Sequence, residues 1–187
     1  MSSIIETLHQ EHRNIALLLS AMEKQIESLA AAGETDFDLL KSIADYFCDY
    51  PNSCHHPKEN AILMQMQVRH PAEAASLRNL EKEHRNASER AVRLRDTLQS
   101  IYQDQFVSRD RLVATAKHFV NAEREHMKME ENLFFPLAAS VLDENDWKII
   151  EGSIRQVQDP MFGELVEKEF ANLRAFLLRW SREAAPV

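Results

Sequence analysis

The chain has 187 residues, with 22 Lys and Arg against 30 Asp and Glu, so its formal net charge at pH 7 is −8. Only 3 glycines are present, which excludes glycine-rich phosphate loops and disfavours hairpin-dense β folds. The acidic balance and scattered basic residues argue against a nucleic-acid partner, and no stretch is long and apolar enough to span a membrane. With only 2 cysteines, a cytoplasmic protein without a disulfide framework is expected.

The first predicted helix begins at Ser3, a good N-capping residue, and runs to Ala32, with Gly33 as its stop. Apolar residues recur along it at steps of three and four, which is typical of a helix face buried in a bundle. One position of this face is a histidine, His12.

A second helical segment is predicted from Asp36 to His70. Pro51 should kink or end it, because proline lacks the amide donor that a helix interior needs. The segment is expected to restart near Cys54, and Pro57 then falls in the first turn of the restarted helix, where proline is tolerated.

A third helix is predicted from Ala72 to Tyr102 and a fourth from Ser108 to Pro136, with Leu133 on the inward face of the fourth. Amphipathic helices joined by short connections are typical of an antiparallel four-helix bundle. The sequence therefore predicts an all-α fold with up-down-up-down topology.

The C-terminal residues are predicted to form a helical extension packed on the bundle. A short helix is expected from Asp143 to Ile150, then a turn at residues 158–160. A last helix should carry Phe162, Val166, Phe170, Leu173 and Leu177. We interpret residues 1–140 as the bundle and residues 141–187 as the extension.

Each of the predicted bundle helices has a histidine where its inward face calls for an apolar residue. Two of these histidines are followed four residues later by a glutamate, which lies on the same face of a helix. Burying such groups costs several kcal/mol unless their charges and lone pairs are engaged. A shared metal site is the economical explanation for the set, which comprises His12, His55, His84, His126, Glu59 and Glu130.

Each feature taken alone has a simpler explanation. A single buried histidine more often bonds a backbone carbonyl, and a His-x-x-x-Glu pair also arises by chance. The combination favours metal binding. Imidazole and carboxylate ligands without thiolate suit iron, manganese, zinc or copper, and this number of ligands suits two ions bridged by the carboxylates, with a position left for a small ligand.

The motifs around these residues are similar to those of the hemerythrin-like (HHE cation-binding) family. They are Glu11-His12-Arg13-Asn14, His55-His56-Pro57-Lys58-Glu59, Glu83-His84-Arg85-Asn86, His126-Met127-Lys128-Met129-Glu130-Glu131, Leu133-Phe134-Phe135-Pro136 and, in the tail, Asp159-Pro160-Met161-Phe162-Gly163. The resemblance implies a non-haem centre of two carboxylate-bridged iron ions. It implies His12 and His55 on one iron, His84 and His126 on the other, and Glu59 and Glu130 as bridges.

One departure from the family's oxygen carriers bears on function. The carriers have a further histidine one turn before the third-helix ligand, and Leu80 stands there in this chain. His56, Glu81 or water is left to complete the coordination of the iron that His84 and His126 would hold. Reversible oxygen transport is therefore disfavoured, and the resemblance implies binding of O2, NO or H2O2 in sensing, redox or stress response.

Several alternatives stay open at this point. A di-iron oxidoreductase and an iron-handling protein are the alternative functions, and a homodimer or an unknown protein partner is also possible. Glu-x-x-His occurs at residues 81–84 and 123–126, which is the ferritin-like di-iron pattern; that interpretation leaves His12 and His55 without a role. An inert bundle with hydrogen-bonded histidines is the remaining alternative.

Overall fold

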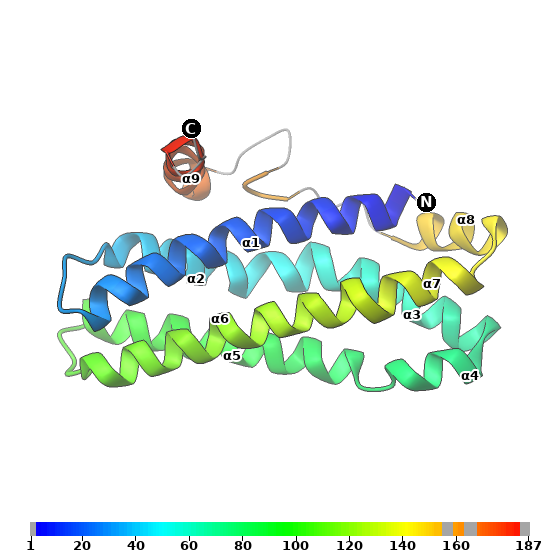
Figure 1. The fold of residues 1–187 in the computed structure, drawn as a ribbon, viewed down its shortest axis with the longest axis horizontal. Helices are drawn as coiled ribbons and strands as arrows, with labels where there is room; N and C mark the ends of the chain where they lie inside the picture. Colours follow the sequence, from blue (N-terminus) through cyan, green and yellow to red (C-terminus); the bar gives the residue numbers. More distant parts are fainter. Residues whose placement is uncertain (1–2, 155–158, 163–167, 184–187) are drawn as a thin grey trace.

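The computed structural model of the chain describes residues 3–154, 159–162 and 168–183. Every regular element in these ranges is helical, so the predicted all-α class is confirmed. The longest elements are α1 (Ser3–Ala30), α2 (Phe37–Tyr50), α3 (His56–Arg69), α5 (Leu80–Tyr102) and α6 (Arg109–Met129). They run along one common axis (Figure 1). The α1–α2 and α5–α6 connections lie at one end of the molecule, and the N-terminus and α8 (Glu144–Ser153) lie at the other.

The long helices enclose two apolar clusters that follow one another along the bundle. α1 packs against α6 and α2, and α5 packs against α2 and α6. One cluster is formed by residues such as Leu19, Ile43 and Phe119, and the other by residues such as Leu8 and Ile62. On α1, the first cluster begins at Ile15 and the second ends at Leu8. The helix turn between them is left for polar residues.

The predicted interruption at Pro51 takes the form of a π-helical turn rather than a break. Residues Pro51–His55 form this turn, η1, and lead directly into α3, whose first turn contains Pro57. The fourth helical segment behaves in the same way. α6 continues through a second π-helical turn, η3 (Glu130–Phe134), into α7 (Phe135–Val141).

The second π-helical turn overturns the prediction that Leu133 faces inward. Leu133 is 44% exposed, whereas Phe134 and Phe135 are buried. A π-helical turn bonds i to i+5 and so holds one residue more than an α-helical turn. The side chains that follow Glu130 are therefore shifted around the helix relative to the α-helical spacing on which the prediction rested.

The predicted third helix is also wrong at its beginning. It is divided into α4 (Pro71–Ala74), the short 3-10 turn η2 (Ala75–Leu77) and α5, which starts at Leu80. The hydroxyl of Ser76 donates a hydrogen bond to the carbonyl oxygen of Glu73 at 2.8 Å. Such local bonds from serine compete with the backbone ladder of a helix.

The tail begins as predicted, with α8 capped by Asp143. The Asp143 side chain accepts from the amides of Asn145 and Asp146, and the Asp146 side chain accepts from the Asp143 amide at 3.1 Å, which completes a capping box. Further on, η4 (Lys168–Phe170) leads into α9 (Ala171–Glu183), which packs against α1 and α2. Among the predicted tail positions, residue 158, Gly163 and Val166 lie outside the described residues.

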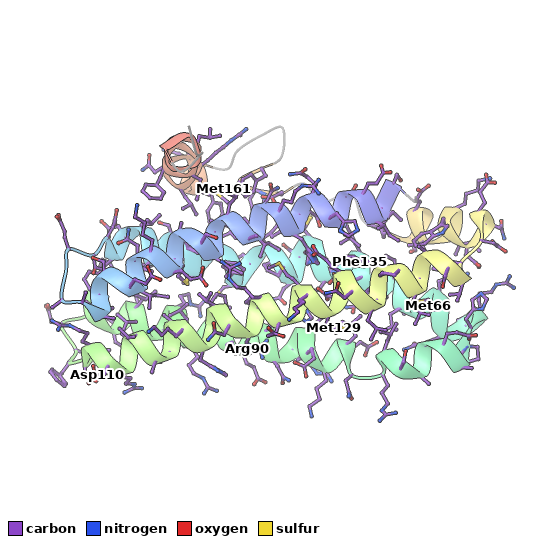
Figure 2. The ribbon with its side chains drawn as sticks, viewed as in Figure 1. Met66, Arg90, Asp110, Met129, Phe135 and Met161 are labelled. Atoms are coloured by element: carbon purple, nitrogen blue, oxygen red, sulfur yellow. The ribbon has the colours of Figure 1, made fainter. Side chains whose placement is uncertain are left out.

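No helix in the described ranges is both long and apolar enough to cross a membrane. The side chains that Figure 2 draws around the outside of the bundle include most of the charged ones, and a smaller set of charged and polar residues is buried between the helices. The apolar faces are those that meet between the helices.

The C-terminus of α1 offers a test of backbone strain. Ala32 has a φ of 57°, the left-handed conformation that glycine adopts most easily. We expect Ala32→Gly to raise the free energy of unfolding by about 0.5 to 1 kcal/mol in urea denaturation, the relief of strain outweighing the added flexibility of glycine.

Gly33 has a different role, and Gly33→Ala is the matched comparison. A Cβ there would lie 2.7 Å from Ser28 Oγ and 3.3 Å from the Ser28 carbonyl oxygen. The Ser28 hydroxyl donates to the Glu34 carbonyl at 2.6 Å, so we expect this variant to lose about 1 kcal/mol of stability. A stabilised Gly33→Ala or a destabilised Ala32→Gly would contradict this description.

Candidate metal centre

All the predicted site residues are buried in the layer of the bundle that lies between the two apolar clusters. Glu59 and Glu130 have no exposed surface at all. The predicted site residues come from α1, η1, α3, α5, α6 and η3. They are His12, His55, His56, Glu59, His84, His126 and Glu130.

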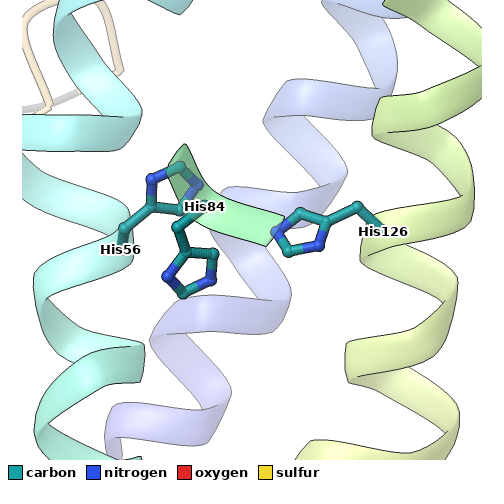
Figure 3. A group of neighbouring side chains, drawn as sticks. All are labelled: His56, His84 and His126. Carbon is teal, nitrogen blue, oxygen red and sulfur yellow. The ribbon is translucent and has the colours of Figure 1, made fainter. Parts of the chain in front are cut away.

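These side chains form two adjacent groups. His12, His55, Glu59 and Glu130 each present a ligand atom within 4.8 Å of the others. His56, His84 and His126 do the same. Figure 3 shows these three rings gathered in the space between α3 and α6.

Each glutamate faces both groups with different oxygen atoms. Oε1 of Glu59 lies 3.3 Å from Nε2 of His55, and its Oε2 lies 3.3 Å from Nε2 of His84. Oε2 of Glu130 lies 3.4 Å from Nε2 of His12, and its Oε1 lies 3.1 Å from Nε2 of His126. Both carboxylates therefore stand where a bridge between two cations would stand.

The polar atoms of the centre lack ordinary partners. Both oxygens of Glu59, Oε2 of Glu130 and both ring nitrogens of His126 are buried without a hydrogen bond. Nε2 of His12 lies 3.2 Å from Nε2 of His55. Unsatisfied buried groups cost about 1 to 3 kcal/mol each, and more when charged. Cations would engage the carboxylate oxygens and the Nε2 atoms of these histidines, and the donor set suits first-row transition metals such as iron.

Charge in the centre is arranged around the two carboxylates. Burial raises the pKa of Glu59, but the neighbouring His55 outweighs it and holds that pKa well below its usual range. Burial lowers the pKa of His55, but Glu59 and Glu11 outweigh it and raise that pKa well above the usual value. The pKa of His84 is likewise raised to about 9, because Glu130 and Glu59 outweigh burial.

Two other imidazoles are held neutral. Burial, reinforced by the charge of His84, lowers the pKa of His56 to about 2. Burial also lowers the pKa of His126, in spite of Glu130. Metal ligation requires ionised carboxylates and neutral imidazoles, so Glu59, His56 and His126 are already in the required protonation state.

Three residues that sequence reasoning missed support the histidines from outside. Glu11 Oε2 accepts from Nδ1 of His55 at 2.9 Å, and Glu131 Oε1 accepts from Nδ1 of His12 at 3.1 Å. Asn60 Oδ1 accepts from Nδ1 of His84 at 3.0 Å. A proton on Nδ1 leaves the lone pair of Nε2 directed into the centre.

No sequence pattern predicts that these three residues contact the histidines of the centre. Glu11 and Asn60 lie beside recognised motif residues, but each contacts a histidine of another helix. Glu131 belongs to the helix of His126 and contacts His12 of α1. Only the packing of the helices brings each pair together.

The structure distinguishes between His56 and Glu81, the two side chains that could replace the histidine that the oxygen carriers have at the position of Leu80. His56 lies with His84 and His126, whereas Glu81 is exposed. The ferritin-like alternative needs Glu81 in the core and leaves out His12 and His55, both of which lie in the centre. That alternative is therefore wrong.

The fold and the centre together define an all-helical protein with a buried histidine and carboxylate metal site. The sequence matches the family model of the hemerythrin HHE cation binding domain over residues 3–138. The chain therefore belongs to this family of non-haem iron-binding domains. No curated protein and no solved structure matches it.

The buried carboxyl group of Glu123 should make the stability of the protein depend on pH. It is buried on α6 with Oε1 3.5 Å from an Arg90 nitrogen. Burial raises its pKa to about 7, Arg90 opposing and Glu130 adding to the rise. The pKa of Glu123 is near 4.5 in the unfolded chain and about 7 in the folded protein. Between these two pH values the folded protein holds the proton more tightly than the unfolded chain, so the contribution of Glu123 to stability falls as the pH rises.

Glu123→Gln should remove this term from the metal-free protein. We expect the free energy of unfolding of the original chain, relative to Glu123→Gln, to be lower at pH 8 than at pH 5, as measured by urea denaturation. Glu81→Gln, at an exposed position, is the control for removing a carboxylate. A difference between Glu123→Gln and the original chain that stays constant with pH would contradict the prediction.

Proposed function

We propose that this chain is a non-haem di-iron protein that binds a small oxidant or diatomic molecule, O2, NO or H2O2, in sensing, redox or stress response. One observation carries the proposal: Glu59 and Glu130 each direct different oxygens toward two separate groups of histidines. A single structural ion needs neither two bridging carboxylates nor five histidines.

The proposed ligand set is the one that the resemblance implied, with one addition. His12 and His55 would hold one iron, His84 and His126 the other, and Glu59 and Glu130 would bridge them. His56 would complete the second iron. We also propose the antiparallel, up-down-up-down arrangement of four helical rods for residues 1–140, which the helix contacts and the positions of the connections support.

When bound, the two iron ions supply an electron reservoir and an attachment point for a small ligand. The chain's own residues perform the remaining tasks. Glu11, Glu131 and Asn60 hold protons at Nδ1 of their histidines and so orient Nε2. The flanking apolar clusters, which include Leu8, Ile62 and Phe134, exclude bulk water.

A peroxide-consuming oxidoreductase is the second candidate, and Glu123 is the observation that favours it. This buried carboxyl group lies one helical turn before His126 and has a pKa of about 7. It can therefore hold or release a proton near neutral pH, as a general acid for oxygen chemistry must. Catalytic turnover of peroxide distinguishes this candidate from simple ligand binding.

The remaining expectations about the chain's surroundings are also proposals. We propose a cytoplasmic protein whose partner is a small molecule rather than a nucleic acid or a membrane. The acidic net charge of −8 supports this proposal. A homodimer or a separate protein partner remains a prediction.

The first test is the metal content of the anaerobically purified protein, with absorption spectra before and after exposure to air, NO or peroxide. We expect two irons per chain and new near-ultraviolet and visible bands. His12→Ala should lower the content to one iron or fewer, because it removes a ligand and leaves its neighbours unsatisfied. His118→Ala, at an exposed histidine of α6, should retain two.

The opposite results are equally clear. A preparation with no metal, or with a single zinc and no spectral change, would overturn the di-iron proposal. Equal iron in His12→Ala and His118→Ala would show that the centre described here does not hold the metal.

A further inference from the structure

The two groups of ligands have different surroundings. We call His12, His55, Glu59 and Glu130 position A, and His56, His84 and His126 position B. The two glutamates reach both positions, so any difference between the positions must come from the histidines and from the side chains that contact them.

At position A, both imidazoles donate to a carboxylate on the side away from the centre. His55 donates to Glu11 at 2.9 Å, and His12 donates to Glu131 at 3.1 Å. A carboxylate on the outer nitrogen makes an imidazole a stronger electron donor to a metal, and removing such a partner typically costs 10- to 100-fold in metal affinity.

Glu11 is held firmly in this role. Its other oxygen accepts from Nζ of Lys58 at 2.6 Å, and Lys58 also lies 3.1 Å from Sγ of Cys54. Glu11 is 8% exposed. The negative charge behind His55 is thus fixed in place by a buried network rather than by a mobile surface side chain.

At position B, the support is neutral or absent. His84 donates to the amide oxygen of Asn60 at 3.0 Å, which carries no charge. Nδ1 of His126 is buried without a hydrogen-bond partner. In the part of the chain that the structure describes, no carboxylate accepts from the outer nitrogen of His84 or His126, in contrast to position A.

The ring of His56, the third imidazole of position B, is oriented so that it cannot bind the same ion as His84. The rings of His56 and His84 are stacked face to face, with centroids 4.1 Å apart and an interplanar angle of 7° (Figure 3). The lone pair of a ring nitrogen lies in the plane of its ring. Two parallel, stacked rings cannot direct their lone pairs at one ion, so His56 has to rotate out of the stack before it can join His84 as a ligand.

We infer, on the basis of the di-iron function proposed above, that the centre is loaded in a fixed order: position A binds iron first and retains it, while position B exchanges its ion as His56 turns away from His84. The loss of a ring stack and the lack of outer carboxylates both weaken position B. Position B is then the one that can fill, empty or accept a different divalent ion.

Release of iron to a chelator tests whether one position retains its ion while the other exchanges it. The whole chain is loaded anaerobically with two ferrous ions, its iron content is measured, and excess ferrous chelator is added in a stopped-flow instrument. We expect two phases of equal amplitude, one ion in each, with rates that differ by at least about 10-fold, the effect of one outer partner.

Three conservative variants assign the phases. Glu11→Gln and Glu131→Gln remove the outer charges of position A, and each should accelerate the slow phase about 10- to 100-fold while leaving the fast phase unchanged. Asn60→Asp places a charge behind His84 and should slow the fast phase by a similar factor. Glu131 is 44% exposed, so Glu131→Gln leaves the core unchanged even if Glu11→Gln does not fold.

The outcomes are distinguishable from a failure of the proposed function. Fewer than two irons before the chelator is added would overturn the di-iron function and this inference with it. Two irons that leave the original chain in a single phase would overturn the inference alone. An accelerated fast phase in Glu131→Gln would assign the positions in the opposite way and overturn the inference. An unchanged fast phase in Asn60→Asp would overturn it as well.

Discussion

The burial of two carboxylates in the middle of the helical core is the constraint on which the rest of this structure depends. Glu59 and Glu130 are completely inaccessible to solvent and lie between two apolar clusters. Charged groups in such a place are strongly destabilising without compensation. The histidines around them supply part of that compensation, and a metal would engage the carboxylate oxygens that remain without a hydrogen bond.

Both His-x-x-x-Glu motifs lie at π-helical turns, which relates the metal chemistry to the backbone. His55 is the last residue of η1, and Glu130 is the first residue of η3. π-Helical turns are uncommon and occur frequently at functional sites. In each case a proline follows within the first turn of the next helix, Pro57 and Pro136, where its missing amide is tolerated.

The outer contacts of the histidines distinguish the two sides of the centre more than the ligands themselves do. The ligand types are nearly symmetrical, because imidazoles lie on both sides of the shared carboxylates. The outer partners are not symmetrical: Glu11 and Glu131 are charged, and Asn60 is neutral. The family assignment identifies the kind of site, whereas these particular side chains determine how each position behaves.

The sequence by itself determined the helical class and predicted the histidines and glutamates that the structure brings together in the centre. A histidine that interrupts an apolar stripe is visible locally, and the spacing of four places Glu59 below His55 and Glu130 below His126 on one face. The predicted helix beginnings at Asp36, Ser108 and Asp143 coincide with the capping residues of α2, α6 and α8, because capping is a local interaction.

Tertiary structure alone decided the rest. The choice of His56 over Glu81, the supporting roles of Glu11, Glu131 and Asn60, and the stacking of His56 on His84 depend on how the helices are placed against one another. Helical periodicity specifies which face of one helix is buried, but it contains no information about which residue of another helix lies opposite. The exposure of Leu133 has the same origin, because the π-helical turn before it shifts the very face that periodicity predicts.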